Sequence, residues 1–382
     1  MGGHSRSARV PAAVWLLVAL AAVLVVVATV VVLAVGRGNE AVQPPGKGGN
    51  GNETNAKGTD VMVLPVFPAG AQGPEGVVSE GDVQTALRRA ADFGAVGVQV
   101  TADISWLCAD GGKCRTSPLE SVVAGARRLG LHVYVQANST PQWLDSRGNW
   151  FGPTGDQVDV WAGMFAQFVE KFGTDVDGYE VWNEPNNPQF WRQGPDAGEY
   201  ADLLKASWSA AKQANPKVQI IGASLSNNDL GFMHALDREL AARGGNPGNR
   251  FFYDLLGVHP YTGNATRGFD PTLPAGRQEA STPFGVKDMT FRGLERLRTQ
   301  VHDDEAVWHD VFIGEFGYDT SPGWYHVPEP KRSEYFVAAF REAAAWPWVR
   351  AFVPYTGDSY AIDGLPSESS LRRAAQELRG SR

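Results

Sequence analysis

The pattern of apolar and polar positions after residue 60 alternates between two kinds of segment. Short, nearly continuous apolar runs are separated by longer stretches with apolar residues at helical spacing. Strands that are apolar on both faces and alternate with helices are typical of a parallel sheet that helices cover on both sides. The apolar runs occupy 61–67, 96–100, 131–137, 178–183, 218–224, 255–261, 311–316 and 350–355.

The helical stretches carry their own boundary signals. Ser79 and Asp82 stand in front of one such stretch. Ser117 and Glu120 predict a capping box at the start of the next, and Gly130 predicts its end.

Eight strand–helix units over residues 60–382 predict an α/β fold, a (β/α)8 TIM barrel. Active-site loops in such a barrel follow the carboxyl ends of the strands. A doubly wound open sheet is the alternative. That fold carries a glycine-rich phosphate turn after its first strand, and VFPAGAQGPEG at this place matches such a turn poorly.

The first 59 residues follow a different pattern. Residues 10–36 form an uncharged apolar run that is long enough to cross the ~30 Å hydrocarbon core of a bilayer as a helix. Two arginines in segment 1–9 predict that this segment stays in the cytoplasm and that the run is a signal anchor. Residues 37–59 are rich in glycine and asparagine, which predicts a flexible linker. The barrel is then expected outside the cell membrane on a single-pass anchor, with cleavage near Ala34 and secretion as the alternative.

Composition narrows the class of partner. Hydrophobic residues make up 43% of the chain and charged residues 20%, as in globular proteins. The net charge of −8 argues against a nucleic-acid partner, which favours a basic surface. The 12 tryptophans exceed what a core needs, so we expect some of them at a binding surface. A monomer is expected, but no sequence feature decides the oligomeric state.

The two cysteines, Cys108 and Cys114, lie close together in LCADGGKC. In an exported protein this spacing predicts a local disulfide, and a pair of free thiols is the alternative. No further cysteine or histidine cluster lies nearby in the sequence to complete a zinc site. We therefore expect no metal and no cofactor.

Polar and aromatic residues collect at the carboxyl ends of the predicted strands, where barrel enzymes hold their catalytic groups. Glu184 and Glu315 directly follow the fourth and seventh strands, which lie on opposite parts of an eight-stranded ring. Glycoside hydrolysis needs two facing carboxyl groups, one as an acid and the other as a nucleophile or base. A salt bridge from either glutamate to a loop arginine such as Arg192 is the alternative. Further candidates for substrate contact are Asn183, His259, Tyr261, Asn138, Trp143, Trp106, Tyr355 and Trp324.

The stretch YEVWNEPNNPQFW around Glu184 resembles the strand-4 motif of the clan A glycoside hydrolases. VHPY and IGEFGYDTSP resemble the motifs of strands 6 and 7, and the likeness is greatest to family 39, with the cellulase-like enzymes of family 5 next. The resemblance implies a retaining mechanism with Glu184 as the acid/base and Glu315 as the nucleophile. It also implies that Asn183 holds the sugar 2-hydroxyl and that His259 and Tyr261 flank the nucleophile.

One position departs from the clan pattern, because clan A enzymes commonly place a tryptophan at the end of strand 8. This chain has FVPYTGDSY there, so Tyr355 or Tyr360 is expected in its place. The prediction is a membrane-anchored, extracytoplasmic glycosidase that cleaves a poly- or oligosaccharide by double displacement. A transglycosylase that remodels surface glycans and a non-catalytic glycan-binding barrel are the alternatives. The sugar, the linkage and exo or endo action are not determined by the sequence.

Asn183 and Glu184 present a geometric difficulty, because adjacent residues of a regular strand point to opposite faces. Their roles require the backbone to distort at this point. Pro185 lacks an N–H and is expected to restrict Glu184 to extended conformations. We expect both side chains in the mouth of the barrel, with Glu315 facing Glu184. Repulsion between the two carboxylates is expected to help keep Glu184 protonated.

Overall fold

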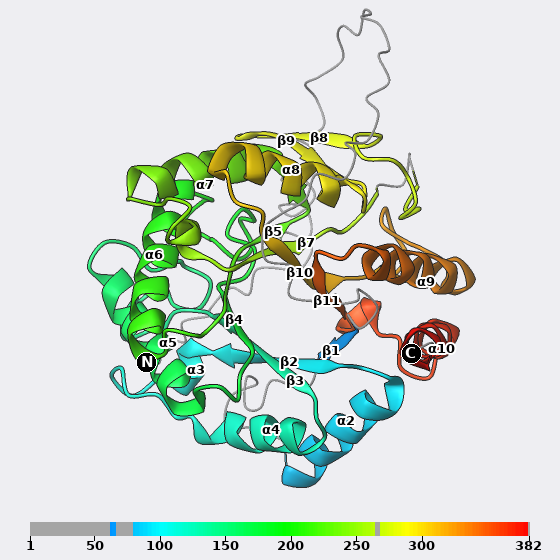
Figure 1. The fold of residues 1–382 in the computed structure, drawn as a ribbon, viewed down its shortest axis with the longest axis horizontal. Coiled ribbons are helices and arrows are strands. Elements are labelled where there is room, and N and C mark those ends of the chain that lie inside the picture. The colour runs from blue at the N-terminus through cyan, green and yellow to red at the C-terminus, as the bar shows by residue number, and fades with distance from the viewer. Residues whose placement is uncertain (1–61, 66–78, 264–267, 381–382) are drawn as a thin grey trace, which may run out of the picture. The chain divides into compact units, whose positions relative to one another are not determined.

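The computed structural model describes residues 62–65, 79–263 and 268–380. Eight parallel strands form one sheet in the order β1-β2-β3-β4-β5-β7-β10-β11, and helices surround it (Figure 1). An isolated parallel bridge between Met62 and Phe352 joins the first strand to the last. The fold is a (β/α)8 barrel, as the apolar pattern predicted.

Each strand of the barrel falls on one of the predicted apolar runs. The strands are β1 (Val63–Pro65), β2 (Gly97–Asp103), β3 (His132–Asn138), β4 (Gly178–Val181), β5 (Ile220–Ser226), β7 (Leu255–His259), β10 (Asp310–Phe316) and β11 (Val349–Pro354). Longer helices alternate with them: α2 (Glu80–Phe93), α4 (Ser117–Arg128), α5 (Gln157–Phe172), α6 (Ala197–Ala214), α7 (Leu230–Ala242), α8 (Gly293–Glu305), α9 (Glu329–Ala345) and α10 (Pro366–Gly380). The short helical segments are α3 (Ile104–Leu107), η1 (Arg250–Phe252) and η2 (Asp358–Tyr360).

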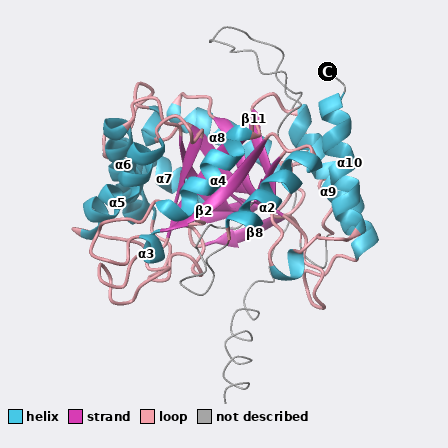
Figure 2. Cartoon of the chain, turned by 90° about the horizontal axis from the view of Figure 1, so that it is seen from below, coloured by secondary structure: helices cyan, strands magenta, loops and turns pink. Residues whose placement is uncertain are grey.

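The strands bury both of their faces, which explains why the runs are apolar almost throughout. Outward-facing side chains pack against the layer of helices that encloses the strands in Figure 2. Inward-facing side chains form a separate apolar cluster inside the ring: Val63, Ile221, Leu255, Phe312, Ala351 and Val353. Above this cluster the interior turns polar, with Gln99, Gln136 and Glu180 buried on β2, β3 and β4. A polar layer of this kind needs internal partners, and it leads directly to the mouth of the barrel.

A small antiparallel sheet, which the sequence pattern did not predict, is added beside the barrel. It consists of β6 (Asn228–Asp229), β9 (Gly285–Asp288) and β8 (Glu279–Thr282), in that order. The sheet follows β5 and precedes α8, and its residue Lys287 reaches the cavity described below.

The predicted signal anchor (10–36) and its flanks (1–9 and 37–59) lie outside the described residues. Within the described ranges, no helix is long and apolar enough to cross a membrane. The longest of these helices, α6 with 18 residues, carries charged side chains on its exposed face because it covers the sheet. This finding contradicts the predicted single-pass localisation at the cell membrane, which is corrected accordingly.

Candidate active site

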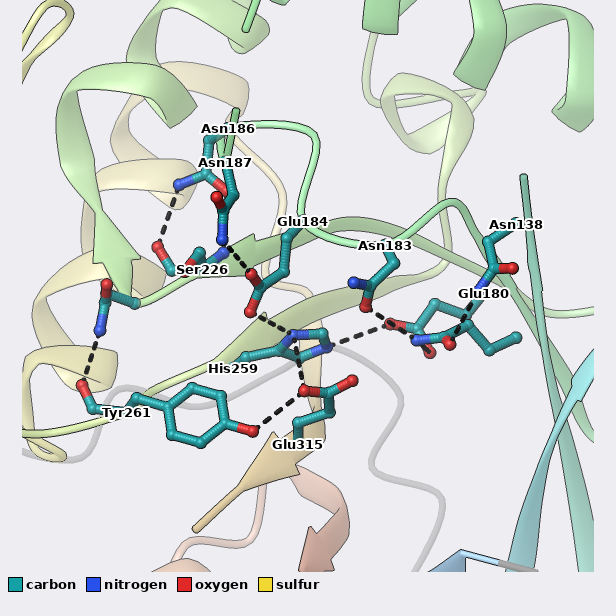
Figure 3. A network of polar contacts seen from close by, with 12 residues as sticks. Asn138, Glu180, Asn183, Glu184, Asn186, Asn187, Ser226, His259, Tyr261 and Glu315 are labelled. Carbon is teal, nitrogen blue, oxygen red and sulfur yellow. Dashed lines mark hydrogen bonds and ion pairs between the residues drawn. The ribbon is translucent and has the colours of Figure 1, made fainter. Parts of the chain in front are cut away.

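The chain turns sharply where β4 ends. Trp182 and Glu184 both have positive φ, 72° and 45°. On a regular strand Trp182 would point into the barrel, but here its ring packs outside the sheet against Trp161 and Trp191. Asn183 and Glu184 face the mouth instead, with exposed fractions of 5% and 4% (Figure 3). The structure therefore has the predicted distortion.

The conformation predicted for Glu184 was wrong in one respect. Pro185 excludes the right-handed helical region for the preceding residue, but it does not enforce an extended backbone here. Glu184 instead adopts the left-handed region. Two left-handed residues on either side of Asn183 are what place two neighbouring side chains on one side of the chain.

Glu315 reaches the mouth through a second irregularity. The register of β10 against β11 shifts between Ile313 and Phe316. Gly314 faces the interior, where an added Cβ would lie 2.9 Å from His259 Nε2, and Glu315 faces the mouth directly after it. A local bulge of this kind is a common way to re-aim a side chain beside an active site.

Glu184 and Glu315 face each other with His259 between them (Figure 3). One carboxylate oxygen of each glutamate and a ring nitrogen of His259 all lie within 4.8 Å of one another. His259 Nδ1 is 3.0 Å from Glu184 Oε1 and 3.8 Å from Glu315 Oε2. Among the residues that the structure describes, no lysine or arginine forms an ion pair with either carboxylate, so the alternative salt bridge to Arg192 is not found.

Each glutamate has a separate neutral donor that orients it. Asn187 Nδ2 donates to Glu184 Oε2 at 2.7 Å, and the Tyr261 hydroxyl donates to Glu315 Oε2 at 3.0 Å. Hydrogen bonds to an ionised carboxylate favour the ionised form. Tyr261 therefore supports a charged Glu315.

His259 is fully buried, and both of its ring nitrogens face carboxylates. Its Nε2 lies 3.4 Å from Oε1 of Glu180, which is itself only 1% exposed. Oε2 of Glu180 accepts hydrogen bonds from Gln99 at 3.0 Å and Gln136 at 3.3 Å. Burial alone would lower the pKa of His259, but Glu315, Glu180 and Glu184 together raise it well above its usual range.

The same charges act on Glu315. Burial raises the pKa of Glu315 to about 7, and the charges of Glu184 and Glu180 raise it while His259 and the Tyr261 hydroxyl oppose the rise. Because Glu184 and Glu315 are so close, the proton present near neutral pH belongs to the pair. The sequence predicted that this proton lies on Glu184.

Two carboxylates and an imidazole also have the composition of a metal-binding set. Both nitrogens of His259, however, lie against carboxylate oxygens, which can only accept hydrogen bonds when ionised. An imidazole that carries both protons has no lone pair for a metal. The donor set therefore fits an ion-pair network rather than a metal centre.

A cavity of about 370 Å³ opens at the pair. Its walls combine aromatic rings with hydroxyl, amide and charged groups, as sugar sites require for the C–H faces and hydroxyls of their ligands. The aromatic residues are Phe190, Tyr261, Phe269, Tyr318, Tyr325, Tyr355 and Tyr360, and the polar residues include Asn187, Ser226, Asn227, Lys287 and Asp319.

No model of a known protein family matches the sequence. Solved structures do share its fold. A family 39 glycoside hydrolase from Bacteroides cellulosilyticus WH2 superposes with a TM-score of 0.57 at 16% identity over 85% of this chain. A monomeric beta-xylosidase from Caulobacter crescentus CB15 gives 0.56 at 14% identity over 81%. Native xylanase 10B from Thermotoga maritima gives 0.54 at 15% identity over 86% of this chain and 98% of its own. The chain has the fold of the family 39 glycoside hydrolases.

This chain spans slightly less than two thirds of the first two of these structures, 65% and 66% of their lengths. In the barrel of this chain, Glu184, Asn183, His259, Tyr261 and Glu315 all come together at the mouth.

Other residues that the sequence marked for substrate contact take different places on this barrel. Tyr355 lines the cavity, together with its alternative Tyr360. Asn138 is buried at the end of β3, where its Nδ2 donates to Gln136 Oε1 at 3.1 Å and so orients that amide.

Trp106, Trp143 and Trp324 are not among the residues that line the cavity. Trp106 lies under the Arg115 guanidinium at 4.4 Å. Trp143 Nε1 donates to the Cys108 carbonyl at 2.8 Å and so anchors the loop between Cys108 and Cys114. A disulfide between these two cysteines closes the loop, as their spacing in the sequence predicted. Trp324 is 60% exposed.

The polar groups of the site that sequence reasoning missed include Glu180, Asn187 and Lys287. The sequence did contain a signal for Glu180. Adjacent residues of a strand point to opposite faces, so with Tyr179 facing outward Glu180 must face the interior of the barrel, on a strand that is buried on both sides. Asn187 lies within the strand-4 motif but outside the predicted strand. Lys287 lies on β9, a strand too short and too polar to show in the pattern.

Proposed function

We propose that this protein is a glycosidase that hydrolyses O-glycosidic bonds of an oligo- or polysaccharide by double displacement with retention of configuration. The separation of the two carboxylates carries the proposal. Carboxyl groups lie roughly 5–5.5 Å apart in retaining enzymes and about 6.5–9.5 Å apart in inverting enzymes, which must fit a water between them. Oxygens of Glu184 and Glu315 within 4.8 Å support the retaining geometry.

In the first step, protonated Glu184 gives its proton to the glycosidic oxygen while ionised Glu315 attacks the anomeric carbon. The bond to the leaving group breaks and an ester to Glu315 forms. In the second step, Glu184 takes a proton from water, whose oxygen attacks the anomeric carbon and releases Glu315. Asn187 and His259 hold Glu184 in place for both steps.

Asn183 is proposed to bind the sugar hydroxyl next to the reacting carbon. Gln136 Nε2 donates to its Oδ1 at 3.1 Å, which fixes the side-chain amide. Figure 3 shows the amide nitrogen of Asn183 on the side that faces Glu184, where it can donate to a sugar in the mouth. A donor fixed before substrate arrives costs no reorganisation during the reaction.

Substitutions of the two glutamates test the proposal. In the full chain, we expect Glu315→Gln to abolish hydrolysis of aryl glycosides and oligosaccharides, because no nucleophile remains. We expect Glu184→Ala to lower kcat for an alkyl or sugar leaving group by roughly 10²- to 10⁴-fold, the usual contribution of a general acid. Azide should restore turnover by Glu184→Ala and release a glycosyl azide, and proton NMR of the first product should show retention.

The control for these variants is Glu305→Gln, a buried glutamate that pairs with His309 at the opposite end of β10. It should keep full activity. Hydrolysis that survives in both Glu315→Gln and Glu184→Ala contradicts the assignment of the pair, and an inverted first product contradicts double displacement.

A further inference from the structure

A third carboxylate lies directly beneath the catalytic pair, where the proposed reaction has no use for it as an acid or nucleophile. Glu180 projects from β4 into the barrel at 1% exposure. In the described part of the chain its one ion pair is with His259, and its carboxylate also accepts hydrogen bonds from the neutral amides of Gln99 and Gln136. A buried charge is costly without a compensating partner, so the geometry makes His259 the counter-ion of Glu180.

The position of the imidazole ring requires it to carry both protons. Its Nε2 faces Glu180, and its Nδ1 faces Glu184 and the ionised Glu315, so a neutral ring would set a lone pair against an ionised carboxylate on one side. Gly314 makes the Glu180 contact possible, because an added Cβ would lie 2.9 Å from His259 Nε2 and 3.1 Å from Glu180 Oε1. The absence of a side chain at Gly314 therefore leaves the space in which His259 and Glu180 meet.

We propose that Glu180 is a positioning residue that holds His259 as a cation with its Nδ1–H directed at Glu184, and that this cation sets the pH range over which the catalytic pair works. The claim about the pH range rests on the proposed glycosidase function. The claim that His259 is a cation does not depend on that function, and it is measured separately.

The direction of the effect follows from which groups face one another. His259 is faced by Glu180, Glu184 and Glu315, with Tyr261 bonded to Glu315. Further out, the Tyr200 hydroxyl lies in the field of Glu180 and Tyr355 in that of Glu315.

The cation touches the catalytic pair directly, whereas Glu180 lies on the far side of the ring. Loss of the positive charge on His259 therefore changes the pKa values of the catalytic pair more than loss of the negative charge on Glu180 does. When Glu180 is neutralised and His259 loses its proton, the pKa values of the pair should rise.

The test is Glu180→Gln in the full chain, followed by kcat/KM against pH. The amide that this substitution introduces can donate to His259 Nε2 and so favours a neutral ring with its proton on Nδ1. We expect both limbs of the pH profile to move upward by about one pH unit, the low end for gain or loss of one nearby charge. At pH 6 this corresponds to a loss of about tenfold in kcat/KM. Glu180→Asp keeps the charge and should keep the limbs in place, even where its rate is lower.

The second measurement is ¹⁵N NMR of labelled histidine, with the His259 signals assigned by their loss in His259→Gln. His259 should remain doubly protonated to well above pH 7 in the unmodified protein and in Glu180→Asp, and become singly protonated near neutral pH in Glu180→Gln. Glu305→Gln, which neutralises the buried partner of His309 instead, should change neither the limbs nor His259.

A neutral His259 in the unmodified protein overturns the proposal, and so does a His259 cation that persists in Glu180→Gln. Limbs that stay in place while the rate falls equally at all pH values overturn it as well, since they indicate a purely structural role. If no glycoside is hydrolysed at all, the proposed function fails, and the NMR result still decides the role of Glu180.

Discussion

At the scale of single residues, the site depends on which way the side chains of residues 179–184 point at the end of β4. Tyr179 faces α5, Glu180 faces the interior, and Trp182 is turned outward by its positive φ so that Asn183 and Glu184 can both face the mouth. Left-handed backbone at non-glycine residues costs roughly 1–3 kcal/mol each. The aromatic contacts of Trp182 with its neighbours, each worth about 0.5–1.5 kcal/mol, offset this strain.

Tyr261 provides a residue-scale prediction. Its hydroxyl donates to Glu315 Oε2 and lowers the pKa of that carboxyl, which burial has raised to about 7. Without the donor, Glu315 should hold its proton to higher pH. We expect Tyr261→Phe to lower kcat/KM by roughly 10- to 100-fold, the worth of a hydrogen bond to a charged group, and to move the pH profile upward.

The matched control for Tyr261→Phe is Tyr253→Phe, which removes a buried hydroxyl that donates to Glu305 Oε1 at 2.8 Å, away from the mouth. It should lower stability and leave the pH profile in place. A Tyr261→Phe enzyme with an unshifted profile would show that the hydroxyl does not stabilise the charge on Glu315.

The sequence predicted the two glutamates because polar residues directly after apolar strands stand out. It did not predict Glu180, because one polar residue inside an apolar strand is distinguished only by the face it occupies. Nor could it show that the pKa of Glu315 is raised. That depends on the position of His259 relative to three carboxylates from two strands and a turn, and on the burial of Glu315.

At the scale of elements, the eight barrel strands were predictable because burial on both faces makes each an apolar run. The sheet of β6, β8 and β9 was not predictable, because its strands have only two to four residues. Most side chains of β8 and β9 are exposed or half-buried, so these strands do not form apolar runs. The predicted capping box of Ser117 and Glu120 was also wrong. Helix α4 begins at Ser117 itself, with Thr116 before it and no side-chain cap, whereas Ser79 and Asp82 form a true capping box on α2.

These two helix starts give a matched pair of substitutions. Ser79 Oγ accepts from the backbone N–H of Asp82 at 3.1 Å, so Ser79→Ala leaves that N–H without its cap. We expect Ser79→Ala to cost about 1 kcal/mol of unfolding free energy, the usual worth of an N-cap. Ser117→Ala should cost much less, since alanine is favourable within a helix. Chemical denaturation measures both, and equal losses would contradict the assigned caps.

At the scale of the whole molecule, a second buried acidic cluster lies away from the mouth. Asp237 on α7 is 3% exposed, and neither of its oxygens has a hydrogen-bond partner among the described residues. Glu305 beside it is held by Tyr253 and His309. Burial, with the charge of Glu305 and then that of Asp304, raises the pKa of Asp237 well above its usual range.

This cluster makes stability depend on pH. Because the folded-state pKa of Asp237 exceeds the unfolded value, the folded protein binds the extra proton, and stability falls as pH rises from about 4 through the folded-state pKa. Asp237→Asn stays neutral at every pH. We expect its Tm to exceed that of the unmodified protein at pH 8 by about 2 °C or more, with little difference at pH 4. A Tm difference that is constant across this range would contradict the linkage.

The seam of the barrel has a consequence for how the molecule opens locally. Among the described residues, Val63, Leu64 and Pro65 of β1 pair with β2, and a bridge joins Met62 to Phe352. β1 is the shortest strand of the barrel in the described residues, and local opening follows the places with few backbone hydrogen bonds, so we expect its amide protons to exchange with solvent before those of the other strands. Glu180 and Glu184 come from β4 and the turn after it, and His259 comes from β7. Transient opening at the seam therefore leaves β4 and β7 paired with their neighbours. The side chains of the site keep their positions while the barrel opens locally elsewhere.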